Sequence, residues 1–131
     1  MTAKKNYSAT TAAQFEIFKK EVAKWINVFG IKGWLVEFQW VDSGDTRAGV
    51  SWKMTGRICC VRLSRKWEER GAPISNDEIK RSAFHECCEL FLSRLVMMAE
   101  GKICNNSDCV TEETHNVIRV LENVLFSWGK K

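Results

Sequence analysis

The period of the apolar residues changes abruptly near residue 33, and this change constrains the fold more than any other feature of the sequence. Before it, apolar residues recur every three or four positions, as on one side of an α-helix, and Gly30 follows as a stop signal. After it, apolar and polar residues alternate, as along a strand buried on one face. The helical set is Phe15, Phe18, Val22, Trp25, Ile26 and Phe29, and the strand set is Trp34, Val36, Phe38 and Trp40. The chain therefore begins with an amphipathic helix followed by a strand.

Further strands and two helices follow the first strand. Turn residues at 42–45 precede a second alternation over 48–54, and Thr55-Gly56 can close a hairpin into a third strand, Ile58 to Leu63. Beyond the single proline, Pro73, a capping box at 75–78 opens a long helix from about Asn76 to about Glu100. After a polar loop, a last helix begins near Thr111. Its apolar side carries Val117, Ile118, Leu121, Val124, Leu125 and Trp128.

This order predicts a single α+β domain over residues 1–131, with a three-stranded, largely antiparallel sheet and a flexible arm at 1–10. With 131 residues, six tryptophans and seven phenylalanines, the chain can bury a sizeable core, which excludes a disordered tail, collagen or a multidomain machine. No apolar run approaches the roughly 18 residues of a membrane span, so we expect a cytoplasmic protein. The net charge of +4 permits a nucleic-acid partner without demanding one.

The cysteines favour thiols over a disulfide framework. Four of the six form adjacent pairs, Cys59-Cys60 and Cys87-Cys88, whose side chains point in different directions and are poorly placed for bridging. We expect reduced core cysteines there. Cys104 and Cys109 flank the polar loop, where a disulfide or a second zinc site is an alternative, but free thiols are the expectation.

The long helix carries the most informative side chains. Its longest apolar stripe, the predicted core face, consists of Phe84, Cys88, Phe91, Leu95 and Met98. His85 and Glu89 lie one turn apart on a neighbouring stripe with Leu92 and Val96. An imidazole and a carboxylate at this spacing can meet on one divalent metal ion, and the simpler alternative is an ion pair worth about 0.5 kcal/mol.

Two other groups could complete a hydrolytic site. Glu86 lies about 100° around the helix from His85, where a general base would flank the metal rather than bind it. The only other histidine, His115, is expected in the first turn of the last helix with Arg119 one turn later, and the loop is long enough to return it to His85. Two histidines and one carboxylate with an open fourth position are the composition of a catalytic zinc site.

These residues resemble the zincin-like metallopeptidases, in particular the small ones encoded by bacteriophages. The resemblance covers most of the chain: the basic, aromatic first helix, the strand at 33–38, the short sheet, the Ala83-Phe84-His85-Glu86 segment, and the segments 111–115 and 118–125. It implies a minimal zincin fold, a cytosolic setting in an infected or lysogenic bacterium, and one Zn²⁺ per chain. By the resemblance His85 and Glu89 are metal ligands, with His115 as the third and Glu86 as the base. Where the family commonly has His-Glu-x-x-His, this chain has Glu89 in place of the second histidine.

The function expected from the resemblance is zinc-dependent hydrolysis of peptide bonds in a peptide or protein substrate. Arg119 would stabilise the oxyanion, and the strand from Ile58 to Leu63 would hold an extended peptide by edge pairing. Glu112 or Glu113 could replace His115 as third ligand, and Cys88 could replace Glu89.

Two alternatives to a peptidase stay open. One is an inactive binding protein on the same scaffold, for example a phage factor that blocks a host defence component. The other is a nucleic-acid-binding module. It would use basic residues interleaved with Trp34, Trp40 and Trp52 on the strands.

Overall fold

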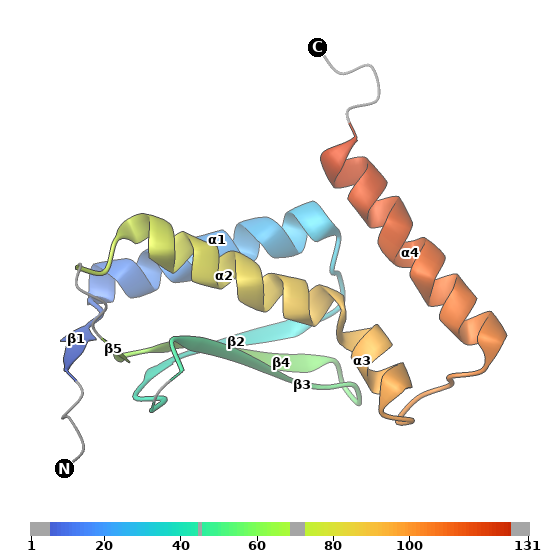
Figure 1. Cartoon of the computed structure of the whole chain (residues 1–131), viewed down its shortest axis with the longest axis horizontal. Coiled ribbons are helices and arrows are strands. Elements are labelled where there is room, and N and C mark those ends of the chain that lie inside the picture. The colour runs from blue at the N-terminus through green and yellow to red at the C-terminus, as the bar shows by residue number, and fades with distance from the viewer. Residues whose placement is uncertain (1–5, 45, 69–72, 127–131) are drawn as a thin grey trace.

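The computed structural model describes residues 6–44, 46–68 and 73–126. In chain order the elements are β1 (Tyr7–Ala9), α1 (Ala12–Phe29), β2 (Leu35–Val41), β3 (Ala48–Lys53), β4 (Ile58–Ser64), β5 (Lys66–Glu68), α2 (Asn76–Phe91), α3 (Ser93–Ala99) and α4 (Ser107–Leu125). Helices α1 and α2 lie side by side over one face of the sheet of β2, β3 and β4, and α4 extends away beyond α3 (Figure 1). The α+β class predicted from the sequence is confirmed.

The three-stranded sheet is mixed, so the expectation of a largely antiparallel sheet is wrong. Its order is β2-β4-β3, with β2 parallel and β3 antiparallel to β4. The connection from β2 to β3 crosses the end of β4, where Arg65 N–H donates to Val41 and Ser64 N–H donates to Arg47. Since β4 is central, its Ile58–Ser64 backbone cannot take the edge-pairing role expected for Ile58 to Leu63.

The core lies between this sheet and the two helices. The alternation read from the sequence is confirmed, because every second residue of β2 and β4 faces the helices and the others face outward. The fully buried apolar side chains include Phe18, Val22, Val61, Leu63, Trp67, Ile79 and Ala83. Trp34, Trp40 and Trp52 pack against this cluster, which supports a core role over a platform for stacked bases.

Local signals set the helix starts. Thr11 and Gln14 form a reciprocal capping box at the start of α1, and α1 ends at Gly30, whose left-handed φ of 67° glycine adopts without strain. The Ser75 hydroxyl accepts the backbone N–H of Glu78 and caps α2 as predicted. The Glu78 carboxylate pairs instead with Arg47 at 3.2 Å, which ties α2 to the start of β3.

The long helix expected from Asn76 to about Glu100 is interrupted at Leu92, which separates α2 from α3. The last helix starts at Ser107 rather than near Thr111, because the Asn106 side chain accepts the N–H of Cys109 and caps it there. Trp128 lies outside the described residues.

The N-terminal arm and the two cysteines of the polar loop differ from what the sequence predicts. Residues 7–9 of the arm expected to be flexible form β1, which pairs antiparallel with β5, while residues 1–5 lie outside the described ranges. Cys104 and Cys109 form a disulfide rather than free thiols, since the Asn106 cap brings their Cα atoms to 6.2 Å. The thiols of the two adjacent pairs are free, as expected. Across the described ranges, no helix is both long enough and apolar enough to cross a bilayer.

We expect Leu63→Ala to lower the free energy of unfolding by about 2–5 kcal/mol, because it removes a fully buried side chain between the sheet and the helices. Urea denaturation followed by circular dichroism measures the change. Leu35→Ala is the matched control, because Leu35 is 59% exposed and its truncation is expected to cost less than about 1 kcal/mol. Equal losses in the two variants would contradict this core.

Candidate metal centre

Three side chains of α2 come together in the C-terminal half of the helix. His85, Glu86 and Glu89 each offer one ligand atom, and these atoms lie within 4.8 Å of one another. His85 Nε2 is 3.3 Å from Glu89 Oε2. The i, i+4 pairing of His85 with Glu89 was predicted from the sequence, and Glu86 joins the same group.

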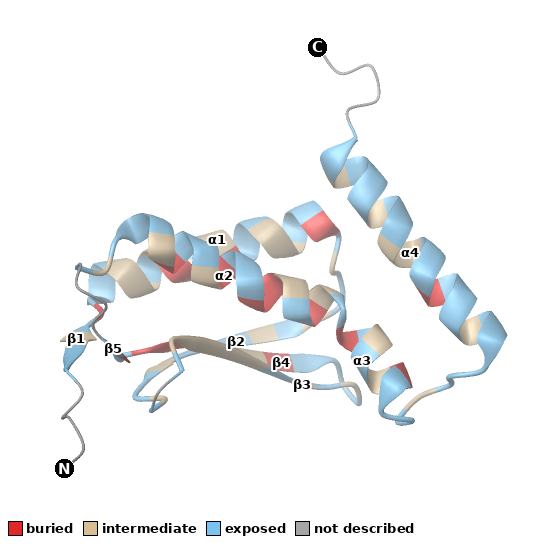
Figure 2. Ribbon diagram, in the orientation of Figure 1, coloured by how far each residue is buried: buried red, intermediate tan, exposed pale blue. Residues whose placement is uncertain are grey.

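The inner face of α2 is not the apolar stripe predicted from the sequence. The inner face of α2 consists of Ile79, Ala83, Glu86, Cys87 and Leu90, so Glu86 is only 5% exposed (Figure 2). The side chains of His85 and Glu89 are 70% and 50% exposed. The predicted core stripe is therefore displaced by one residue, or about 100° around the helix.

The aromatic members of that stripe explain the displacement. Phe84 meets Trp25 edge-on at 4.6 Å, and Phe91 stacks on Phe29 at 4.9 Å. Both contacts lie between α1 and α2, and Phe84 stays partly exposed. The apolar stripe thus faces the neighbouring helix, and the smaller residues beside it face the interior.

Burial raises the pKa of Glu86 to about 8. Removal from water is the largest cause, followed by a hydrogen bond with the Glu89 carboxyl and by the negative charge of Glu89, while the positive charge of Arg62 acts in the opposite direction. Glu86 therefore keeps its proton near neutral pH. A carboxyl with its pKa in this range is suited to accept and return a proton.

The spacing of the pair suits a small divalent cation. Two ligand atoms at about 2.0–2.1 Å from a tetrahedral zinc ion lie about 3.4 Å apart, and His85 Nε2 and Glu89 Oε2 are 3.3 Å apart. One imidazole and two carboxylates are a donor set that zinc accepts. The same 3.3 Å separation equally defines an exposed ion pair between His85 and Glu89.

The structure does not bring His115 or Arg119 into this group. His115 is an exposed residue of α4, and among the described residues the only clustered metal-ligating side chains are the three on α2. The Arg119 guanidinium donates to Asn116 one turn earlier on α4. Because α4 begins at Ser107 and packs mainly against α3 and α1, His115 lies further along the helix than predicted.

The other candidate ligands are also outside the group. Glu113 is buried and its carboxylate accepts from Arg94 Nε at 2.9 Å, while Glu112 is exposed on α4. The Cys88 thiol has a raised pKa because it is partly buried. Sequence reasoning missed Arg62, which lies on β4 and acts on Glu86 only through the fold.

A comparison of the chain with models of known protein families, with curated proteins and with solved structures finds no match. The candidate site therefore rests on the geometry of this chain.

The free energy of unfolding is expected to decrease as pH rises from about 4.5 to about 8, by at most about 1.4 kcal/mol per pH unit from this group. Over that range the folded state keeps a proton on Glu86 that the unfolded state has lost, so the stabilisation is complete at lower pH and is lost as the folded protein deprotonates. Urea unfolding in the presence of a chelator, at pH values from about 5 to about 8.5, measures it. Glu86→Gln should remove this component and Glu122→Gln, an exposed control, should keep it. Identical pH profiles for native protein and Glu86→Gln would contradict the burial of a titrating Glu86.

Proposed function

We propose that the protein is a metal-dependent peptidase in which His85 and Glu89 hold a zinc ion and Glu86 is the general base. The observation that carries the proposal is the 3.3 Å approach of His85 to Glu89 beside a carboxyl that burial keeps ready to exchange a proton. When bound, the cation would polarise the scissile carbonyl and lower the pKa of an attacking water.

The side chains around the cation would then have different roles in the reaction. Exposure of His85 and Glu89 leaves the outer side of the group open to a substrate. In its ionised form Glu86 would take the proton from the water and pass it to the leaving amine. The proposal keeps His115 as third ligand and Arg119 as oxyanion donor, which requires α4 to approach α2 more closely when substrate or metal binds.

The substrate strand follows from the sheet order. Strand β3 is an edge of the sheet and α2 packs against it, whereas β4 is paired on both sides. An extended peptide could therefore add to β3 by main-chain hydrogen bonds, next to the helix that carries the site. The proposal therefore gives β3 (Ala48–Lys53) the peptide-pairing role that the sequence analysis expected of Ile58 to Leu63.

A second candidate function is a binding protein on the same scaffold without turnover, such as an inhibitor of a host defence component. It is favoured by Glu89 in place of the histidine usual in the zincin-like family and by the position of His115 outside the α2 group.

The proposed setting is the cytoplasm of a bacterial host. The four free cysteines favour this setting, whereas the Cys104–Cys109 disulfide favours an oxidising compartment.

Zinc binding tests the ligand assignment. Native protein should bind about one zinc ion per chain, and His85→Ala and Glu89→Ala should weaken binding by more than about 100-fold, because each removes a donor. Equilibrium dialysis with elemental analysis measures both. Glu122→Gln should bind as native protein does.

His115→Ala decides the third ligand in the same assay. A loss of affinity comparable with that of His85→Ala assigns His115 to the ion, and unchanged affinity assigns the site to α2 alone. Full zinc occupancy in His85→Ala would refute the site.

Activity separates the two candidate functions. In zinc-loaded protein, Glu86→Gln should lower the rate of hydrolysis of fluorescently labelled casein by about 10²–10⁴-fold while zinc content is unchanged, because it removes the base and keeps the shape. Glu122→Gln should cleave at the native rate. Zinc-loaded native protein that cleaves no faster than Glu86→Gln would favour the binding protein.

A further inference from the structure

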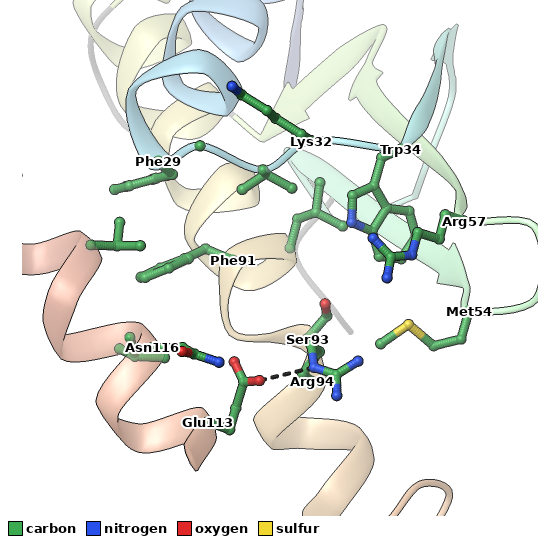
Figure 3. A pocket seen from close by; sticks show the side chains of 15 residues that line it. Phe29, Lys32, Trp34, Met54, Arg57, Phe91, Ser93, Arg94, Glu113 and Asn116 are labelled. Atoms are coloured by element: carbon green, nitrogen blue, oxygen red, sulfur yellow. Dashed lines mark hydrogen bonds and ion pairs between the residues drawn. The ribbon is translucent and has the colours of Figure 1, made fainter.

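A cavity of about 210 Å³ lies where α1, α3, α4 and the turn between β3 and β4 meet (Figure 3). Its walls are largely apolar, with Phe29, Trp34 and Phe91 among them. A second, more polar hollow of about 390 Å³ shares Arg57, Arg94, Glu113 and Asn116 with it. Neither hollow is lined by His85, Glu86 or Glu89, so this place is distinct from the candidate metal centre.

Arg57 supplies a positive charge at the boundary of the two hollows. It lies in the turn between β3 and β4, and its backbone has a left-handed φ of 48°, which is uncommon for a residue with a side chain. Its Nη1 would lie 3.4 Å from a Cβ placed on Gly33, so the guanidinium runs close over that glycine. Among the described residues, no hydrogen bond or ion pair of the guanidinium is found.

Ser93 is a second polar group without a partner. It is 2% exposed, it lines the cavity, and its hydroxyl points into the space between Phe91 and Trp34 (Figure 3). Within the ranges that the structure describes, this hydroxyl makes no hydrogen bond. A hydroxyl that faces a cavity in this way can donate a hydrogen bond to a ligand bound there.

The charged residues that line the cavity favour a ligand with a single negative charge. Arg94 is paired with Glu113 at 2.9 Å, and the ammonium group of Lys32 points away from the cavity (Figure 3). Lys32 and Arg57 are the described lining residues whose charges have no ion-pair partner, and of the two it is Arg57 whose charge is not turned away from the cavity. A carboxylate matches this balance, whereas a phosphate dianion would bring excess negative charge.

We propose that this cavity binds a small carboxylate with an aromatic or apolar body. The carboxylate pairs with Arg57 and accepts from the Ser93 hydroxyl. The body lies against Phe29, Phe91 and Trp34, where burial of its apolar surface adds to affinity. The volume is below the roughly 300–1,000 Å³ of pockets for drug-sized ligands, so a one-ring ligand fits best. Both a free acid and the C-terminal residue of a peptide have this chemistry.

Isothermal titration calorimetry of the full chain with 3-phenylpropanoate and with 3-phenylpropanamide tests the proposal. The acid is expected to bind at least about tenfold more tightly than the amide, because only the acid can pair with Arg57. Arg57→Gln should lose about tenfold in affinity for the acid, and Ser93→Ala about threefold or more. Arg81→Gln, an exposed residue of α2 that lines neither hollow, removes the same charge and should bind as native protein does.

N-acetyl-Ala-Ala-Phe as acid and as amide distinguishes the two sources. Tighter binding of the peptide acid than of 3-phenylpropanoate identifies a peptide C-terminus, and the opposite order identifies a free acid. Equal affinity of acids and amides, absence of binding, or native affinity in Arg57→Gln would overturn the proposal. Arg57 is exposed, so its replacement leaves the core intact, and circular dichroism of each variant checks the fold.

Discussion

Both candidate sites depend on one constraint, which is the orientation of α2 about its own axis. This orientation decides which of its side chains face the core. Ala83 is fully buried on the inner side of α2, and the Cys87 thiol beside it donates to the Val22 carbonyl of α1 at 3.6 Å, so α2 lies close to its neighbours along small side chains. A larger residue turned inward would force the two helices apart. This packing fixes Glu86 on the inner side and leaves His85 and Glu89 on the outer side.

Placing a carboxyl on the inner side has a chemical consequence. Ionised Glu86 would be a buried negative charge next to the Glu89 side chain, so the folded protein keeps a proton on Glu86. The packing that fixes the orientation of α2 therefore also raises the pKa of Glu86, which lies beside His85. A cation at this position would offset the two negative charges and release that proton, so metal binding and pH are expected to be linked.

Much of the fold could be predicted from the sequence because its signals are local. The alternation in β2, the Gly30 stop and the Ser75 cap each depend on a few neighbouring residues, and each was correctly predicted. The parallel pairing of β2 with β4 depends on a crossing connection that leaves no local pattern. The inner face of α2 was predicted wrongly because the most hydrophobic stripe packs against α1, while Ala83, Cys87 and Glu86 face the interior.

The end of α2 shows that binding sites, too, can depend on features that leave no local pattern in the sequence. No proline or glycine marks the break at Leu92, yet the break is where Ser93 enters the wall of the cavity. Arg57, Ser93 and Phe29 are far apart in the sequence, and no spacing relates them, because the hollow forms only when the turn, α3 and the end of α1 meet. The candidate metal-binding group, by contrast, lies within five consecutive residues of one helix, so helical geometry alone made it visible. Sites confined to one element are therefore the ones that a single sequence can reveal, and sites assembled between elements require the structure.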